Sequence, residues 1–299
     1  MSSKKNDEAL ERITADQYRK RSASAEIWRN FRKNKGAMLG LIFLILLFLI
    51  AFTISFWLPE SKVTGMSRDR LVAPCAAHPF GTDNMGRDLF WRVLYASRYS
   101  LSIGFVAVIV AVFIGVPLGA IAGYYGGLTD NIIMRITDIF HAVPNILMAM
   151  VVVAVLGNGT FNLMLAVGIV SIPQFSRITR AAVLTVKNNE YIEAVRALGK
   201  RDAYIIARHI LPNCLSPIIV QVTLRVGSAI IAASSLSFLG LGITPPMPEW
   251  GSLLNAGREY IRNYSYLTLF PGLAIMITVL AFNLVGDGLR DAMDPKLKN

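Results

Sequence analysis

The charged side chain that stands out from its surroundings is Arg225, near the middle of a long apolar run from about Leu215 to Leu241. If that run crosses a membrane, a charge at this depth is costly, so the guanidinium should face a protein interior or an aqueous cavity. There it could bind the carboxylate of a substrate. The alternative is a structural pair with a backbone carbonyl or with an acid of a partner subunit.

Other chemistry is missing from the chain. It has no GxSxG or HExxH motif and no paired carboxylates in an apolar setting, so we expect no enzyme activity. It also lacks a GxxxxGK[ST] phosphate loop, which indicates that it does not itself bind and hydrolyse ATP. The two cysteines and three histidines have no metal-ligand spacing, which argues against a metal site or a disulfide framework. We therefore expect no cofactor on this chain.

A polar, charged interval from Glu190 to Pro212 interrupts the apolar second half of the chain. It predicts two short helices. The first should stop at Gly199, because glycine suits the position after a helix, and the second should start after Asp202 and stop before Pro212. Apolar residues at helical spacing give the first helix one apolar edge, made of Ile192, Val195 and Leu198.

The first of these helices needs a partner surface. Glu193, Ala194 and Ala197 give it a face of small residues, which fits a protein groove. A helix lying on a membrane would instead favour basic residues with large hydrophobic ones. Of these two alternatives, the small residues favour docking on another chain over a position on the membrane surface.

Composition places the chain among membrane proteins. Of its 299 residues, 54% are hydrophobic and only 16% are charged, whereas soluble domains carry about 25% charged residues. The net charge of +11 comes from basic residues that flank the apolar runs. This distribution indicates membrane orientation rather than nucleic-acid binding.

The apolar runs predict an all-α membrane protein with six crossings and both termini in the cytoplasm. The expected organisation is a basic tail (1–36, in which 14–34 forms an interfacial helix or stays solvated), a first crossing (37–58), an outer loop with an interfacial helix (59–98), a core of five crossings (99–290) and a cytoplasmic tail (291–299). Within the core, the crossings are expected at about 99–122, 139–156, 161–183, 215–241 and 266–285.

Several residues predict local features of these helices. Gly115, Gly119 and Gly123 repeat at four-residue spacing, a pattern that allows close helix packing. Pro144 should start or kink the third crossing, and Pro173 could break the fourth. Thr82 or Asp83 should cap the interfacial helix, and Trp250 should sit at the membrane interface.

The polar interval resembles the signature of the membrane subunits of binding-protein-dependent ABC importers. Glu193-Ala194-Val195 precedes Gly199 at the family spacing, and His209-Ile-Leu-Pro212 follows at the expected place. Val195 and His209 depart from the pattern, and the histidine is similar to the peptide-transporter branch. The resemblance implies a type I importer permease fold with a cytoplasmic coupling helix, in which Glu193, Ala194 and Gly199 carry coupling to an ATPase subunit.

Further motifs are similar to those of the C-type permease of the dipeptide/oligopeptide/nickel family. They are Phe80-Gly-Thr-Asp-x-x-Gly-Arg-Asp88, Leu236-Ser-Phe-Leu-Gly-Leu-Gly242, Pro246-x-Pro-Glu-Trp-Gly251, and Asn283-x-x-Gly-Asp-Gly-Leu-Arg-Asp291 with Asp294-Pro295. The resemblance implies a bacterial or archaeal cell-membrane complex with a second homologous permease, two ATP-binding subunits that carry ATP and Mg, and an extracytoplasmic solute-binding protein. The solute implied is a dipeptide or oligopeptide.

Alternatives within the family are glutathione, nickel chelates and other metallophores. From a different class, an ion-coupled carrier or channel acting alone would also be a helical membrane protein. Such carriers use intramembrane acids as relays, and the predicted crossings hold almost none. A membrane scaffold without transport activity is the remaining alternative.

Overall fold

The computed structural model describes residues 23–243 and 245–294. In these ranges the chain is helical, apart from turns, loops and one isolated bridge between Thr82 and Asp88. The helices are α2 (Ala23–Phe31), α3 (Lys35–Trp57), α4 (Glu60–Thr64), α5 (Leu89–Tyr125), α6 (Gly127–Ala142), α7 (Asn145–Leu156), α8 (Thr160–Val186), α9 (Glu190–Ala197), α10 (Asp202–Ile205), α11 (Leu215–Phe238), α12 (Trp250–Gly257) and α13 (Tyr266–Met293).

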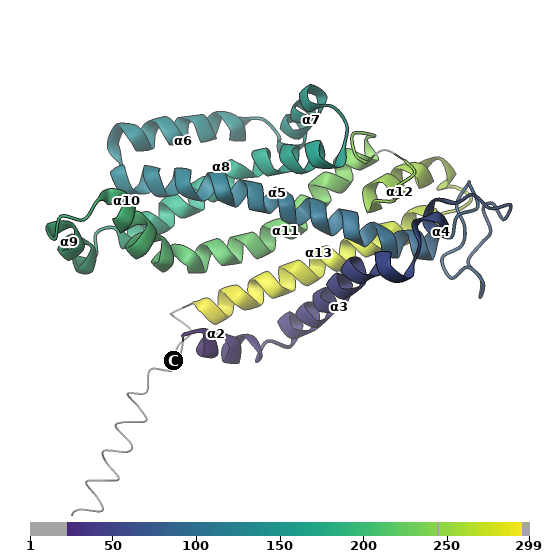
Figure 1. The fold of residues 1–299 in the computed structure, drawn as a ribbon, viewed down its shortest axis with the longest axis horizontal. Helices are drawn as coiled ribbons and strands as arrows, with labels where there is room; N and C mark the ends of the chain where they lie inside the picture. Colours follow the sequence, from purple (N-terminus) through teal and green to yellow (C-terminus); the bar gives the residue numbers. More distant parts are fainter. Residues whose placement is uncertain (1–22, 244, 295–299) are drawn as a thin grey trace, which may run out of the picture.

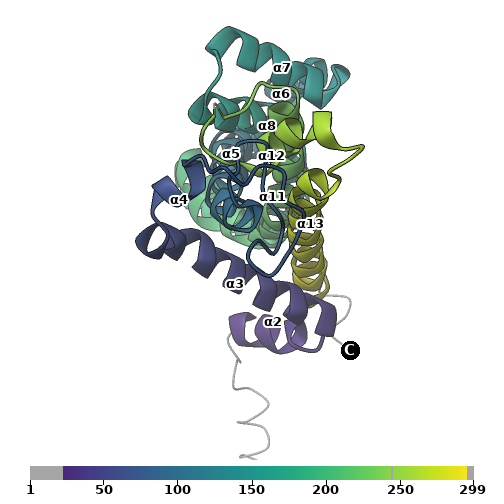
Figure 2. The same cartoon turned by 90° about the vertical axis from the view of Figure 1, so that its right-hand side faces the viewer.

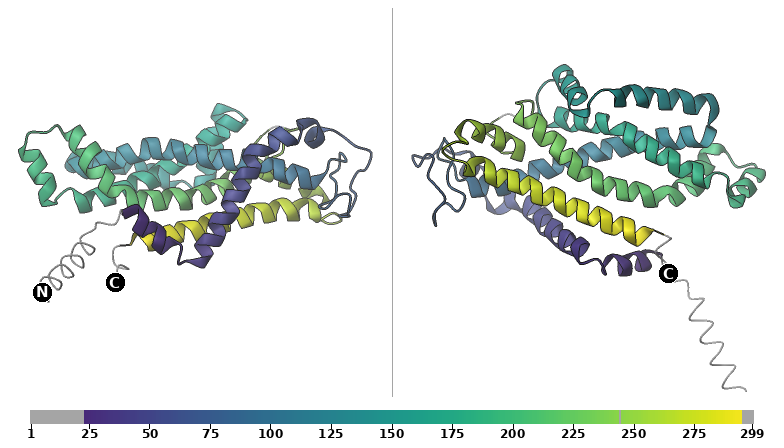
Figure 3. Two further views of the ribbon diagram at one scale, coloured as in Figure 1. Left: turned by 60° about the horizontal axis from the view of Figure 1, so that its bottom comes forward. Right: turned by 180° about the vertical axis from the view of Figure 1, so that it is seen from behind.

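The long helices form an elongated bundle (Figure 1). Helices α5, α8 and α11 lie in its middle, with α3 and α13 on one flank and α6 and α7 on the other (Figures 1 and 2). Helix α9 lies at one end, which we call the α9 end, and α4 and α12 lie at the opposite α12 end. Figure 3 shows α3 crossing the bundle obliquely.

The expected number of membrane crossings agrees with this arrangement. Five helical segments in the described residues are long and apolar enough to cross a membrane, and the count reaches six if α6 and α7 together form one bent crossing. The two are bent by 93° at Val143 and Pro144. Proline disfavours helical backbone in the residue before it, and Val143 is indeed extended.

Four local expectations about these helices were wrong. The interfacial helix and the second crossing are one continuous helix, α5, because no helix-breaking residue separates them. Its cap is Asp88, whose carboxylate accepts from the backbone N–H groups of Phe90 and Trp91, rather than Thr82 or Asp83. The polar link after α5 is helix α6, and Pro173 lies inside the unbroken α8.

The N-terminal region is docked in the part that the structure describes. Helix α2 packs against α13, and Phe31 is buried there beside Gly288. Residues 23–31 of the tail are therefore a helix docked on α13. The expectations for residues 1–22 and 295–299 lie outside the described residues.

The glycine repeat of α5 brings its backbone against that of α8. A Cβ atom added at Gly115 would lie 2.7 Å from Phe175 Cβ, and one at Gly119 would lie 2.2 Å from the carbonyl oxygen of Ser176. At Gly123 the same atom would lie 2.9 Å from Val183 Cβ. The prediction of close packing is confirmed, since no side chain fits between these backbones.

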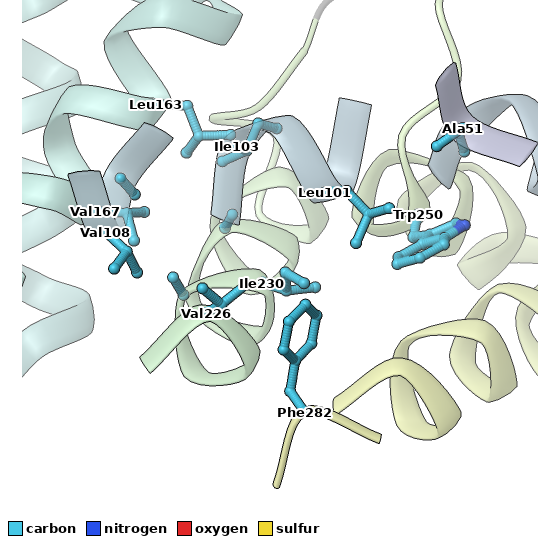
Figure 4. Packing of buried hydrophobic residues seen from close by; sticks show 14 of the residues in the cluster. Ala51, Leu101, Ile103, Val108, Leu163, Val167, Val226, Ile230, Trp250 and Phe282 are labelled. Carbon is cyan, nitrogen blue, oxygen red and sulfur yellow. The ribbon is translucent and has the colours of Figure 1, made fainter. Parts of the chain in front are cut away.

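A shared apolar core joins the central helices to α13. Its buried residues include Ile103 of α5, Ile230 of α11 and Phe282 of α13, and Figure 4 shows Ile230 beside the ring of Phe282. Trp250 of α12 also belongs to this core and is only 1% exposed. Its indole faces the protein interior rather than the surface, and its Nε1–H donates to the carbonyl of Val93 at 3.0 Å.

The glycine contact generates a stability prediction. Gly119→Ala should lower the midpoint of thermal unfolding in detergent by several degrees, because the new methyl group meets a backbone carbonyl and overpacking costs about 1–3 kcal/mol. The matched control is Gly272→Ala in α13, where the nearest atom would lie 3.9 Å away. Equal midpoints for the two variants would contradict the packing argument.

Candidate functional site

Helix α9 is fastened to the rest of the molecule by one side of its surface. Ile192 is fully buried in a cluster that includes Val183 of α8, Ile205 of α10 and Ile210. Val195 packs against the same cluster from one turn further along. Two residues of the predicted apolar edge, Ile192 and Val195, therefore face inwards and attach α9 to the helices beneath it.

The opposite side of α9 is open. Glu193, Ala194 and Gly199, the residues expected to carry coupling, are all exposed and lie at the α9 end. Gly199 ends the helix with a φ of +70°, and no atom lies within 4 Å of where its Cβ would be. Leu198, expected on the buried edge, is 76% exposed because it occupies the C-cap, where the chain has already turned away.

The connection from α9 into the bundle differs from the expected second helix. After α10 the chain continues through a π-helical turn, Ile206–Ile210, and a 3-10 turn, Leu211–Cys214, directly into α11. The prediction that the helix stops before Pro212 was wrong. Pro212 lies in the first positions of the 3-10 turn, where the missing N–H does not interrupt a hydrogen bond of that turn.

Asp202 does not precede the second helix, as the sequence predicted, but is its first residue. Arg201 takes the N-cap position of α10, and the Asp202 carboxylate accepts a hydrogen bond of 2.7 Å from the hydroxyl of Tyr124 at the end of α5. The guanidinium of Arg196 lies 5.5 Å from the centre of the same tyrosine ring. Tyr124 therefore links α5 to both α9 and α10, so three elements meet behind the exposed face.

Basic residues at the end of α8 are paired with α6 and α5. The Arg180 guanidinium donates to Asp130 at 2.6 Å, and that of Arg177 donates to Asp138 at 2.7 Å. Lys187 Nζ donates to the carbonyl of Gly123 at 2.8 Å. These contacts tie the segment leading into α9 to two neighbouring helices.

Arg225 lies on α11 and faces α8. Its Nε and Nη2 atoms donate to Ser171 Oγ at 3.2 and 3.1 Å, and no carboxylate of the described residues lies within ion-pair distance of it. Arg225 and Ser171 line a cavity of about 280 Å³ between α7, α8 and α11. The partner of Arg225 in the described chain is thus a serine hydroxyl. The sequence had suggested a backbone carbonyl, an acid of a partner subunit or a substrate carboxylate.

Sequence reasoning missed a buried polar cluster at the α12 end. Glu249 is fully buried and accepts from Ser100 and Ser234 at 3.1 and 3.3 Å, as well as from the backbone N–H groups of Gly251 and Ser252. It thereby joins α5, α11 and α12. The only sequence signal is Ser252 three residues after Glu249, which completes a reciprocal cap.

A second missed cluster holds the loop before α5. Asp83 accepts from Arg87 Nε at 2.7 Å and lies 3.6 Å from Arg92, all three being buried. Neither cluster presents a metal site: the described residues contain no group of three or more His, Cys, Asp or Glu side chains arranged around a common point.

Comparison with known proteins identifies the family. The sequence profile of the binding-protein-dependent transport system inner membrane component matches residues 115–299, and that of the N-terminal TM domain of oligopeptide transport permease C matches residues 22–74. The fold resembles the MetNI methionine ABC transporter in an inward-facing conformation, with a TM-score of 0.57 and 18% identity over 69% of this chain and 98% of that one.

Two similar relatives cover nearly the whole chain. A dipeptide transport system permease protein of Alkalihalophilus pseudofirmus is 46% identical over 95% of this chain and 93% of the relative. A glutathione transport system permease protein of Pectobacterium atrosepticum is 48% identical over 92% of this chain and 91% of the relative. The chain therefore belongs to the family of binding-protein-dependent transport system inner membrane components.

Proposed function

We propose that this multi-pass inner membrane protein is one of two homologous permease subunits of an ATP-driven importer for dipeptides and oligopeptides. Helix α9 is its coupling helix, and Glu193, Ala194 and Gly199 contact an ATP-binding subunit. The observation that carries the proposal is the exposed small-residue face of α9, fixed to the bundle by Ile192. The similarity to a dipeptide permease supports the choice of solute.

The proposed complex contains this chain, the second permease, two ATP-binding subunits and an extracytoplasmic solute-binding protein. ATP and Mg bind to the ATP-binding subunits. The α9 end faces the cytoplasm, because it carries Arg196, Lys200 and Arg201 on exposed positions and basic residues favour that side. Helix α2 and the end of α13 lie towards the same end (Figure 1), which supports the proposal that the chain enters and leaves the bundle on the cytoplasmic side.

Glutathione is the second candidate solute. The similarity to a glutathione permease favours it, and glutathione is itself a tripeptide-sized molecule with free carboxylates. The solute-binding protein chooses among these solutes before they reach the permease. Nickel chelates and other metallophores are the remaining candidates within the same proposal.

A reconstitution experiment tests the energy source and the solute together. The complete complex in proteoliposomes should take up a labelled dipeptide only when ATP is present on the side of the membrane that carries the ATP-binding subunits. Excess unlabelled glutathione should compete only if glutathione is also a solute. Uptake by the two permeases alone, without ATP-binding subunits, would overturn the proposal in favour of an ion-coupled carrier or channel.

Substitution of Gly199 tests the coupling surface. Gly199→Trp should lower ATP-driven dipeptide uptake about tenfold or more, because the bulky ring prevents α9 from seating, and each loss of about 1.4 kcal/mol lowers the docking equilibrium constant tenfold. The protein should still insert into the membrane, and the ATP-binding subunits should still hydrolyse ATP. The measurements are uptake, ATPase rate and membrane level of the same preparations.

Gly199→Asn is the matched control, since asparagine tolerates a positive φ and adds only a small side chain. It should retain most of the uptake. Wild-type uptake by the tryptophan variant would show that this surface does not seat on the ATP-binding subunit. Equal losses in both variants would assign the effect to the backbone turn.

A further inference from the structure

One face of α11 carries an arginine and two serines. Residues spaced by three and four positions lie on one side of a helix, and here they are Arg225, Ser228, Ala232, Ser235 and Leu239. Ser228 is exposed, and Arg225 and Ser235 are half-buried. The two serine hydroxyls donate to carbonyls of α11 itself, those of Leu224 and Ile231. A guanidinium facing lipid would be costly, so Arg225 belongs to a protein interior or a water-filled path.

Cavities accompany this face along most of its length. The 280 Å³ cavity at Arg225 is also lined by Asn145, Ser228 and Ser235. A second, largely apolar cavity of about 550 Å³ shares Ile231 and Ser235 with the first and continues to Leu239. At 1.5 Å per residue, the distance from Arg225 to Leu239 along the helix is about 21 Å. The two cavities thus lie next to each other along α11, the larger one beside Leu254 of α12 and the smaller one at Arg225.

The guanidinium of Arg225 has unused donor capacity in this cavity. A guanidinium carries five N–H donors, and in the described chain the hydroxyl of Ser171 is the acceptor that Arg225 meets. Ser171 donates its own proton to the carbonyl of Val167 at 2.7 Å, so its oxygen is oriented as an acceptor. The hydroxyl fixes the arginine but leaves its positive charge without a counterion.

Two other arginines of the same region differ from it. Arg177 and Arg180 on α8 each donate to a carboxylate of α6, so their charges are already neutralised. Of these three arginines, Arg225 is therefore the one whose charge no carboxylate of the described residues neutralises. Asn145, at the first position of α7, adds an amide to the same cavity, which matches the peptide group next to a terminal carboxylate.

We propose that Arg225, oriented by Ser171, binds the carboxylate of the solute as it passes through the cavity between α7, α8 and α11. This inference rests on the proposed function, because it assumes that the solute is a peptide with a free carboxylate. Arginine suits the task since it remains charged at any physiological pH and binds a carboxylate through two parallel hydrogen bonds. Binding there offsets the loss of water around the carboxylate in an otherwise apolar passage.

The test compares alanylalanine with its C-terminal amide in proteoliposomes that contain the complete importer. Each solute is supplied at a concentration that saturates the solute-binding protein. That concentration is determined beforehand in a binding assay on the isolated solute-binding protein. The ratio of acid uptake to amide uptake is determined for wild type, Arg225→Gln and Arg225→Lys. Preference of the binding protein affects all variants equally, so the change in ratio isolates the permease.

Arg225→Gln should lower the acid-to-amide ratio about tenfold, in the range expected when a hydrogen bond to a charged group is lost. Arg225→Lys keeps the charge but not the two parallel donors, and should fall between wild type and the glutamine variant. The matched control is Arg177→Gln, which removes an arginine that is already paired with Asp138 and should leave the ratio unchanged.

An unchanged ratio in Arg225→Gln would overturn the inference. So would an equal loss of both solutes in the glutamine and lysine variants, or failure of both to assemble, because Arg225 would then serve helix packing or pair with an acid of the second permease. If wild type takes up neither solute with ATP, the proposed function itself fails. That result is distinct from the others because it appears before any substitution.

Discussion

The contact on which the structure depends is the close approach of α5 and α8 at the glycine repeat. A Cβ at Gly119 would lie 2.2 Å from a backbone carbonyl of α8, so the distance between the helices is set by the missing side chains. Lipid provides no hydrophobic force to bring helices together, and such van der Waals contact is what holds them. Ser176 adds a hydrogen bond of 3.1 Å to the carbonyl of Gly115 across the same contact. Helices α6, α9 and α11 pack around this pair.

Helix α9 is held by contacts with several neighbouring helices. Ile192 is enclosed by residues of α8 and α10, and Tyr124 of α5 holds Asp202. From Asp202 to Phe238 the chain is helical throughout, so in the proposed coupling a displacement at the α9 end would pass along α11 towards Arg225. The less regular turns at Ile206–Cys214 are the place where this path can bend, because π and 3-10 hydrogen bonding is weaker than α-helical bonding.

Sequence patterns predicted the features that depend on local chemistry. The apolar runs located the crossings, the four-residue spacing of glycines predicted the α5–α8 contact, and Gly199 does end α9 with positive φ. The failures arose where tertiary packing decides. Pro212 does not end its helix because a 3-10 turn accommodates it. The burial of Glu249 depends on two serines from distant helices, which no local pattern connects. The roles of Glu193, Ala194, Gly199 and Arg225 stay predictions.

The arrangement of acids bears on where the energy for transport enters. An ion-coupled carrier needs a carboxylate within the membrane that gains and loses a proton or a cation during the cycle. In the described part of the chain, Glu249 is the fully buried carboxylate, and its oxygens accept from two hydroxyls and two backbone N–H groups. These four donors hold Glu249 as a fixed cap of α12. Asp130 and Asp138 are likewise engaged by arginines. With Glu249, Asp130 and Asp138 engaged in structural contacts and α9 presenting an open face, the described chain fits the proposed role of receiving energy from a partner subunit.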